Sequence, residues 1–179
     1  MDIAIFQEIE QTTNELIDLL SSANEKELNK IPFEGSWTAA QVAEHLLKSY
    51  GVVEILKAPQ TKTERLPDEK AELLKSLFLN FSQKVKSAAA ILPSDDFIKK
   101  EELISALNKK ILKIKEIIET QDLSEICETV ALPVFGALTK LEWLYLILYH
   151  TQRHIHQIKN IFQTLKTNKN EISKSLSEF

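Results

Sequence analysis

The chain has 179 residues and a formal net charge of −4 at pH 7, and 44% of its residues are hydrophobic. This length suits one domain built around a single hydrophobic core. The negative charge argues against a nucleic-acid-binding surface, because such surfaces gather lysine and arginine. The single cysteine, Cys127, excludes an internal disulfide and suits a reducing compartment.

Composition also bears on fold class and location. There are only three glycines and five prolines, while Leu, Ile, Lys and Glu are abundant, which favours an all-α protein. The first residues, MDIAIFQEIE, lack the basic and continuous apolar segments of a signal peptide. No stretch approaches the roughly 18 apolar residues of a membrane span. We therefore expect a soluble, cytoplasmic protein with no membrane or nucleic-acid partner.

Hydrophobic periodicity predicts four long helices, of which the first two lie before residue 60. The first covers residues 2 to about 22, and a loop follows from Asn24 to Gly35. The second opens at Thr38 with a capping box, Thr38-x-x-Gln41, and ends at Ala58-Pro59-Gln60. Gly51 lies within this helix, where it predicts close packing or a kink.

Residues 58–99 predict a long crossover segment between the second and third helices. This segment carries a helix of its own, from Asp68 to about Lys86. The third main helix spans about Lys100 to Thr120, and residues 122–137 form a longer connection.

The fourth helix opens with a second capping box, Thr139-x-x-Glu142, and is predicted to run to about Leu165. Residues 1–166 are thus interpreted as one helical bundle domain. Residues 167–179 are interpreted as a polar C-terminal tail that frays.

Three of the four histidines lie on the fourth helix. With about 100° between successive residues, His150 and His154 fall on its core-facing arc and His156 falls on the opposite, polar side. His45 lies at the centre of an apolar arc of the second helix. A His-x3-His pair facing a third histidine is the geometry of a three-imidazole metal site with open coordination positions. The alternative is that each histidine is a core residue bonded to a neighbour or to water.

Several other metal and nucleophile motifs are absent from the sequence. No histidine has a glutamate three residues before it, as di-iron bundles require. His150 is not followed by glutamate, which excludes the His-Glu-x-x-His motif of metalloproteases. There is no glycine-rich phosphate loop and no Gly-x-Ser-x-Gly motif.

Two short motifs resemble those of the DinB-like superfamily. They are Trp37-Thr38 followed by Glu44-His45, and His150-x3-His154 followed by Gln157. This family comprises metal-binding four-helix bundles and includes bacillithiol transferases and mycothiol-dependent maleylpyruvate isomerases. The resemblance covers about residues 1–166. Many members read His-His-Arg-Gly-Gln at the end of the second motif, whereas this chain reads Arg-His-Ile-His-Gln over residues 153–157.

The resemblance implies that one divalent metal is bound by His45, His150 and His154, and that the chain forms a homodimer. Neutral imidazoles suit Zn, Ni, Fe or Cu. Gln41 and Gln157 each lie one turn from a histidine, which makes them candidates for hydrogen bonds to the ligands or for contacts with a small-molecule substrate.

The resemblance further implies an enzyme that transfers a low-molecular-weight thiol to a small electrophile. A metal-dependent hydrolase is the runner-up, and a non-enzymatic, metal-stabilised bundle is the competing class. A structural zinc usually has four protein ligands, so three favour an open, reactive site. The glutamate beside a ligand, Glu44, lies about 100° around the helix from His45. The lack of a carboxylate on the histidine faces favours thiol transfer over hydrolysis.

Overall fold

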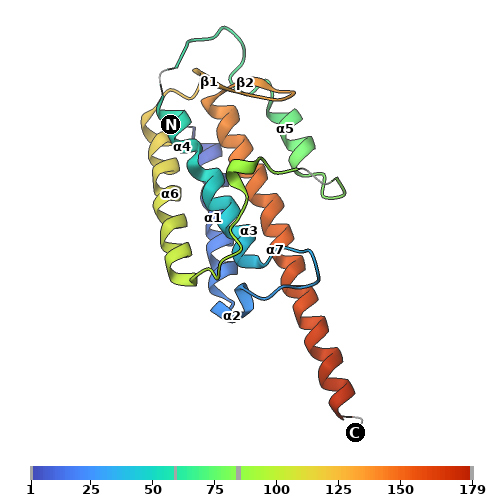
Figure 1. Cartoon of the computed structure of the whole chain (residues 1–179). Helices are drawn as coiled ribbons and strands as arrows, with labels where there is room; N and C mark the ends of the chain where they lie inside the picture. The colour runs from blue at the N-terminus through green and yellow to red at the C-terminus, as the bar shows by residue number, and fades with distance from the viewer. Residues whose placement is uncertain (1, 59, 84–85, 178–179) are drawn as a thin grey trace.

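The protein is a four-helix bundle, described here from a computed structural model that covers residues 2–58, 60–83 and 86–177, with only the backbone for 171–177 (Figure 1). Three of the bundle's helices are α1 (Ile3–Ser21), α6 (Lys100–Thr120) and α7 (Lys140–Ser177). The other is formed in succession by α3 (Ala39–Ser49), the 3₁₀ turn η1 (Tyr50–Val52) and α4 (Val53–Lys57). The predicted all-α four-helix bundle is confirmed.

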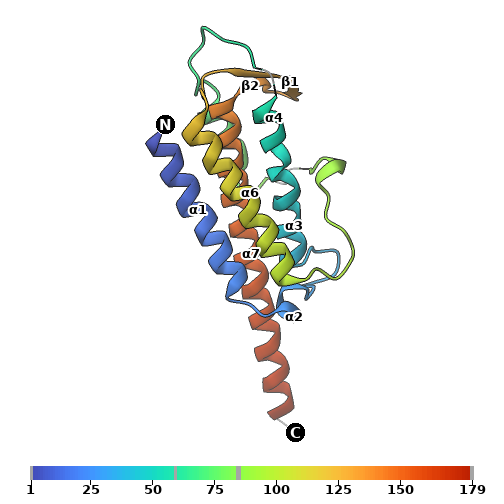
Figure 2. The same cartoon turned by 90° about the vertical axis from the view of Figure 1, so that its left-hand side faces the viewer.

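The direction of the helices explains the crossover. Helices α1 and α3 each pack against both α6 and α7, so α1 and α3 occupy opposite corners of the bundle. Figures 1 and 2 show α1 and α7 running one way along the bundle, and α3 and α6 running the other. Because α3 and α6 are parallel, the chain must return along the whole bundle between them. Residues 58–99 make this return.

The crossover contains less helix than the sequence predicts. Helix α5 covers only Ala71–Phe78 and packs against α7, and the 3₁₀ turn η2 (Ala89–Ile91) packs against α3. The helix predicted to reach Lys86 ends at Phe78, and the carbonyls of Phe78 and Asn80, which have no helical partner among the described residues, accept hydrogen bonds from the Arg153 guanidinium of α7. Residues 84 and 85 of that prediction lie outside the described residues, as does Pro59.

The longer connection predicted for residues 122–137 contains a β-hairpin, which the prediction did not include. Strands β1 (Ile126–Leu132) and β2 (Gly136–Thr139) pair antiparallel, with an irregularity between Cys127 and Ala131. The sequence does carry a strand-and-turn signal here, since residues 126–132 include three β-branched residues and are followed by Pro133 and Gly136. At the tip, Val134 has φ 74°, a conformation that is strained for a β-branched residue.

Other local differences have simple causes. The predicted loop after α1 contains the short helix α2 (Glu25–Leu28), which has a capping box between Asn24 and Glu27. A Cβ added at Gly51 would meet nothing within 4 Å, so close packing does not explain this glycine. The helix changes there from α to 3₁₀ geometry.

Helix α7 extends past the predicted end near Leu165 and continues to Ser177. Its C-terminal part extends beyond the rest of the bundle (Figures 1 and 2). No Pro or Gly interrupts this stretch, so nothing in it ends the helix. The last two predicted tail residues, 178 and 179, lie outside the described chain. No helix among the described residues is long and apolar enough to cross a membrane.

A buried carboxylate fixes the start of α7. Glu142, whose side chain is fully buried, receives two 2.6 Å hydrogen bonds from Arg65 of the crossover. It also accepts the backbone N–H groups of Lys70 and Thr139 at 2.9 Å. The Thr139 hydroxyl in turn accepts the Glu142 N–H, which completes the predicted capping box. Crossover, hairpin and α7 therefore meet at one side chain.

We expect Glu142→Gln to lower the free energy of unfolding by roughly 3 kcal/mol, because it leaves the Arg65 guanidinium without its anion. Burial acts to raise the pKa of Glu142, but the hydrogen bonds from Arg65, Thr139 and Lys70 outweigh it and hold the pKa below 4.5. A carboxylate with a lowered folded-state pKa stabilises the fold above its unfolded-state pKa and loses that effect as the pH falls.

The difference in the free energy of unfolding between wild type and Glu142→Gln should therefore be largest near pH 7. It should shrink below about pH 4.3, the unperturbed pKa of glutamate. Urea unfolding at a series of pH values measures it. Glu116→Gln, at an exposed position of α6, is the matched control and should behave as wild type. A constant difference across the pH series would contradict this account of Glu142.

Candidate metal centre

Three imidazoles from two helices meet inside the bundle. The Nε2 atom of His150 lies 3.1 Å from Nε2 of His45 on α3 and 2.9 Å from Nε2 of His154, one turn along α7. His45 and His154 are buried, with 1% and 7% of their surface exposed. Ligand atoms of all three residues lie within 4.8 Å of one another. The structure thus brings together the three histidines that the sequence singles out.

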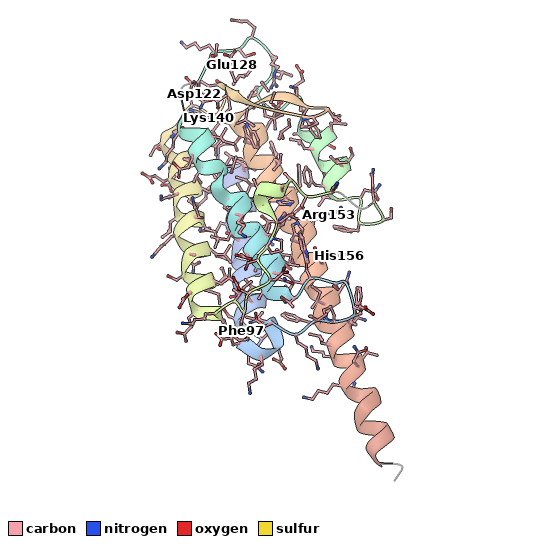
Figure 3. The ribbon with its side chains drawn as sticks, viewed as in Figure 1. Phe97, Asp122, Glu128, Lys140, Arg153 and His156 are labelled. Carbon is pink, nitrogen blue, oxygen red and sulfur yellow. The ribbon has the colours of Figure 1, made fainter. Side chains whose placement is uncertain are left out.

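His156 takes no part in this cluster. It is exposed on the opposite side of α7, bonds to Asn160 at 3.0 Å and stacks on Phe81 with ring centroids 4.2 Å apart (Figure 3). Its position agrees with the polar face that the helical projection assigns to it.

Hydrogen bonds at the outer nitrogens fix where the protons lie. Nδ1 of His45 is 2.7 Å from the backbone carbonyl of Ile91, and Nδ1 of His154 is 2.8 Å from Oε1 of Gln157. Since these oxygens only accept, each Nδ1 must carry the proton, and each Nε2 then presents a lone pair to His150.

The neutral His150 ring can donate at most one proton from Nε2, so it can satisfy only one of these two neighbours. The lone pair of the other neighbour is then left facing His150 Nε2 at hydrogen-bond distance with no proton to accept. A cation shared by the three lone pairs removes this conflict. The donor set therefore fits a divalent metal held by three imidazoles.

Burial keeps the three rings neutral. It lowers the pKa of His154 to about 4, and the nearby charges of His45 and Arg153 act in the same direction. Burial likewise holds the pKa of His150 well below 6.5 and lowers that of His45, although the Ile91 carbonyl opposes the shift at His45. Neutral imidazoles bind metal without first losing a proton, so the site is ready for a cation at neutral pH.

Residues 91–94 of the crossover pack beside His45, and Gln41 is one of the residues that hold this segment in place. The Gln41 amide accepts the Thr38 N–H in the capping box and donates to the Ser94 carbonyl at 2.9 Å. Glu44 accepts the Ser94 N–H at 2.7 Å, and Lys48 donates to the Leu92 carbonyl at 2.8 Å. These bonds tie residues 91–94 to α3 and so hold the Ile91 carbonyl against His45. Gln41 thus reaches the imidazoles only through the backbone, whereas Gln157 contacts one directly.

A cavity of about 560 Å³ opens beside the imidazoles, and all three histidines line it. Lys48 and Arg153, each one turn from a histidine on the same helix, also line the cavity, as does Lys86 from the crossover, and the far end is apolar. Residues from the hairpin, including Leu132 and Phe135, form part of that apolar end. The sequence interpretation missed these contributors, although the strand-and-turn signal of residues 126–136 could have indicated the hairpin.

No carboxylate is present among the described residues that line the cavity. Among the described residues, the Arg153 guanidinium bonds to neutral carbonyls alone, those of Phe78, Asn80 and Gln83. Its positive charge is therefore not neutralised by a partner, and it helps to lower the pKa of His150 and His154. The cavity is electropositive at its histidine end even before a metal binds.

Comparison with known proteins identifies the family. The family model described as the DinB superfamily matches residues 8–158. The chain belongs to the DinB superfamily. It is 25% identical to the uncharacterized protein YuaE of Bacillus subtilis over 169 residues, which is 92% of this chain and 99% of YuaE. The DinB assignment agrees with the resemblance carried by the two histidine motifs.

Two solved structures share the fold. TT2238, a four-helix bundle protein, aligns with a TM-score of 0.57 and 21% identity over 88% of this chain and 97% of its own. YfiT from Bacillus subtilis, described as a probable metal-dependent hydrolase with an unusual four-helix bundle topology, aligns with a TM-score of 0.58 and 18% identity. That alignment covers 91% of this chain and 86% of YfiT. At these identities the two structures show the four-helix-bundle fold alone.

We expect one divalent metal per chain, and His45→Ala, His150→Ala and His154→Ala should each remove most of it, because two remaining imidazoles bind far more weakly than three. Elemental analysis of the purified proteins measures the content. His156→Ala, which alters a histidine outside the cluster, should retain the metal. Full occupancy in all three cluster variants would show that the histidines are ordinary core residues.

Gln157→Leu should weaken metal binding by about 10- to 100-fold, because the Gln157 carbonyl orients His154 and fixes its tautomer. Competition with a chromogenic chelator measures the affinity. Gln163→Leu, on an exposed position of the same helix, provides a control of equal chemical change. The same affinity in both variants would contradict the role given to Gln157.

Proposed function

We propose that this protein is a metal-dependent enzyme that transfers a small thiol to an electrophilic substrate held in the cavity. The observation that supports this proposal is the lining of the cavity. It combines three convergent imidazoles with cationic side chains, and no carboxylate is among its described residues. A bound divalent metal would supply Lewis-acid chemistry, lowering the pKa of a thiol from its free value of about 8.5, or that of water.

His45, His150 and His154 would hold the metal, and they leave open positions because they are only three donors. The substrate would lie in the cavity beside them, where the apolar lining limits access of water. Arg153 and Lys48 place positive charge near the imidazoles, and this charge favours a sulfur anion over a neutral thiol. Both effects support thiolate chemistry at this end of the cavity.

The transfer itself is a displacement. The thiol loses its proton to solvent, and its sulfur donates an electron pair to an electrophilic carbon. A carbon–sulfur bond forms as the bond from carbon to the leaving group breaks, and the leaving group departs as an anion with that electron pair. No group in the protein needs to accept a proton in this scheme, which matches a cavity lining without a carboxylate.

Metal-dependent hydrolysis is the second candidate, favoured by the description of YfiT as a probable metal-dependent hydrolase. A hydrolase that activates water needs a general base within hydrogen-bond reach of the water. The nearest glutamate along α3, Glu44, instead bonds to Ser94 and Lys48. Thiol transfer therefore ranks first. A non-enzymatic role is the third alternative, because a metal shared by α3 and α7 would also stabilise the bundle.

The test is conjugation of small thiols to 1-chloro-2,4-dinitrobenzene by protein loaded in turn with Zn, Ni or Fe, run beside an esterase and amidase panel. We expect metal-dependent conjugation that is lost in His150→Ala and retained in His156→Ala. Turnover in the hydrolase panel alone would place hydrolysis first. No turnover in either panel, with metal bound, would support the non-enzymatic role.

A further inference from the structure

The cavity beside the imidazoles has a polar end and an apolar end. The change from polar to apolar lining is seen along both of the helical walls that enclose it. Along the α3–η1–α4 wall the lining changes from His45 and Lys48 to Val52 and Ile55. Along α7, read in the opposite direction, it changes from Arg153 and His150 to Leu146 and Trp143. Because the two walls are antiparallel (Figure 1), their polar residues face the same end and their apolar residues the other.

The hairpin closes the apolar end. Strand β1 packs against α4 and strand β2 packs against the start of α7, so the hairpin joins the two walls beyond Ile55 and Trp143. Leu132, Pro133 and Phe135 from its tip region line the cavity. The strained Val134 lies between these residues and is itself 91% exposed. The turn therefore presents apolar side chains to the cavity from both sides of Val134.

The polar end carries positive charge that the protein leaves uncompensated. Lys48 is paired with Glu44 at 3.2 Å. Arg153 is held only by carbonyls. Lys86 lines the cavity and has no ion-pair partner within the described part of the chain. Arg153, one turn from His150 on α7, thus contributes charge available to an anionic ligand at the imidazole end, and Lys86 adds a further positive charge to the cavity lining.

We infer, on the basis of the proposed function, that the substrate is an elongated apolar molecule with a single anionic group, its anion at the imidazole end and its apolar body against the hairpin. A volume of about 560 Å³ suits a molecule of this kind, since small-molecule sites span roughly 300–1,000 Å³. A cationic ligand is disfavoured at the polar end, and a wholly polar one is disfavoured by the lining around Leu146 and the hairpin.

Binding of matched amphiphiles to metal-free protein, measured by calorimetry, tests this inference without any turnover. Decanoate, decanol and decyltrimethylammonium share a tail and differ in the charge of the head. We expect decanoate to bind about tenfold more tightly than decanol, and decyltrimethylammonium most weakly. Equal affinities for the three heads, or preference for the cation, would overturn the charge assignment.

A series of carboxylates from hexanoate to decanoate tests the apolar end with no change to the protein. Each added methylene that enters the cavity should tighten binding by up to about fourfold. Affinity that does not rise with chain length would show that the tail lies outside the cavity. Leu132→Asp, which places a carboxylate at the hairpin end, should weaken decanoate binding, with circular dichroism confirming that the variant is folded.

Lys86→Gln should weaken decanoate binding by about threefold and leave decanol binding unchanged, as expected for loss of an exposed charge. The control is Lys109→Gln, at an exposed position of α6 away from the cavity. Equal effects of the two substitutions would contradict the placement of the anion. Decanoate binding in a protein without conjugation or hydrolysis would preserve this inference and contradict the proposed function, so the two can fail separately.

Discussion

The convergence of three Nε2 atoms on one point is the constraint on which the rest of this structure depends. The Ile91 and Gln157 oxygens fix the protons of His45 and His154 on Nδ1, so two lone pairs point at His150. One ring cannot satisfy both with a single proton. In the buried interior of a bundle, this arrangement is unfavourable unless a cation is shared by the three rings.

Holding this arrangement requires α3 and α7 to stay in register. One turn from the histidines, the Thr151 hydroxyl donates to the Ile147 carbonyl and accepts from the buried Tyr50 hydroxyl at 2.8 Å. Farther along, Glu142 joins the start of α7 to the crossover through Arg65. The crossover then returns along α3 and supplies the Ile91 carbonyl. The fold thus supports the imidazoles from the core side and from the crossover side.

The electrostatics and the shape of the site point to the same chemistry. Burial keeps the imidazoles neutral, while Arg153 contributes a charge that only backbone carbonyls solvate. An anion is favoured in such a site, and more strongly once a divalent metal is present. The hairpin adds an apolar end that the four helices alone would leave open. The anionic group of a ligand and its apolar body would therefore contact different parts of the chain, the histidine-bearing helices and the hairpin.

The sequence by itself determined the bundle, both capping boxes of its histidine-bearing helices and the inward direction of His45, His150 and His154, because periodicity and capping are local properties of a helix. It did not predict the extent of α5, whose last carbonyl is bonded by Arg153 some 75 positions away. Nor could it place the Ile91 carbonyl on His45, since a backbone oxygen carries no sequence signal. The cavity was decided only by the tertiary structure, because its polar and apolar ends are brought into line by antiparallel packing and by the hairpin that closes them.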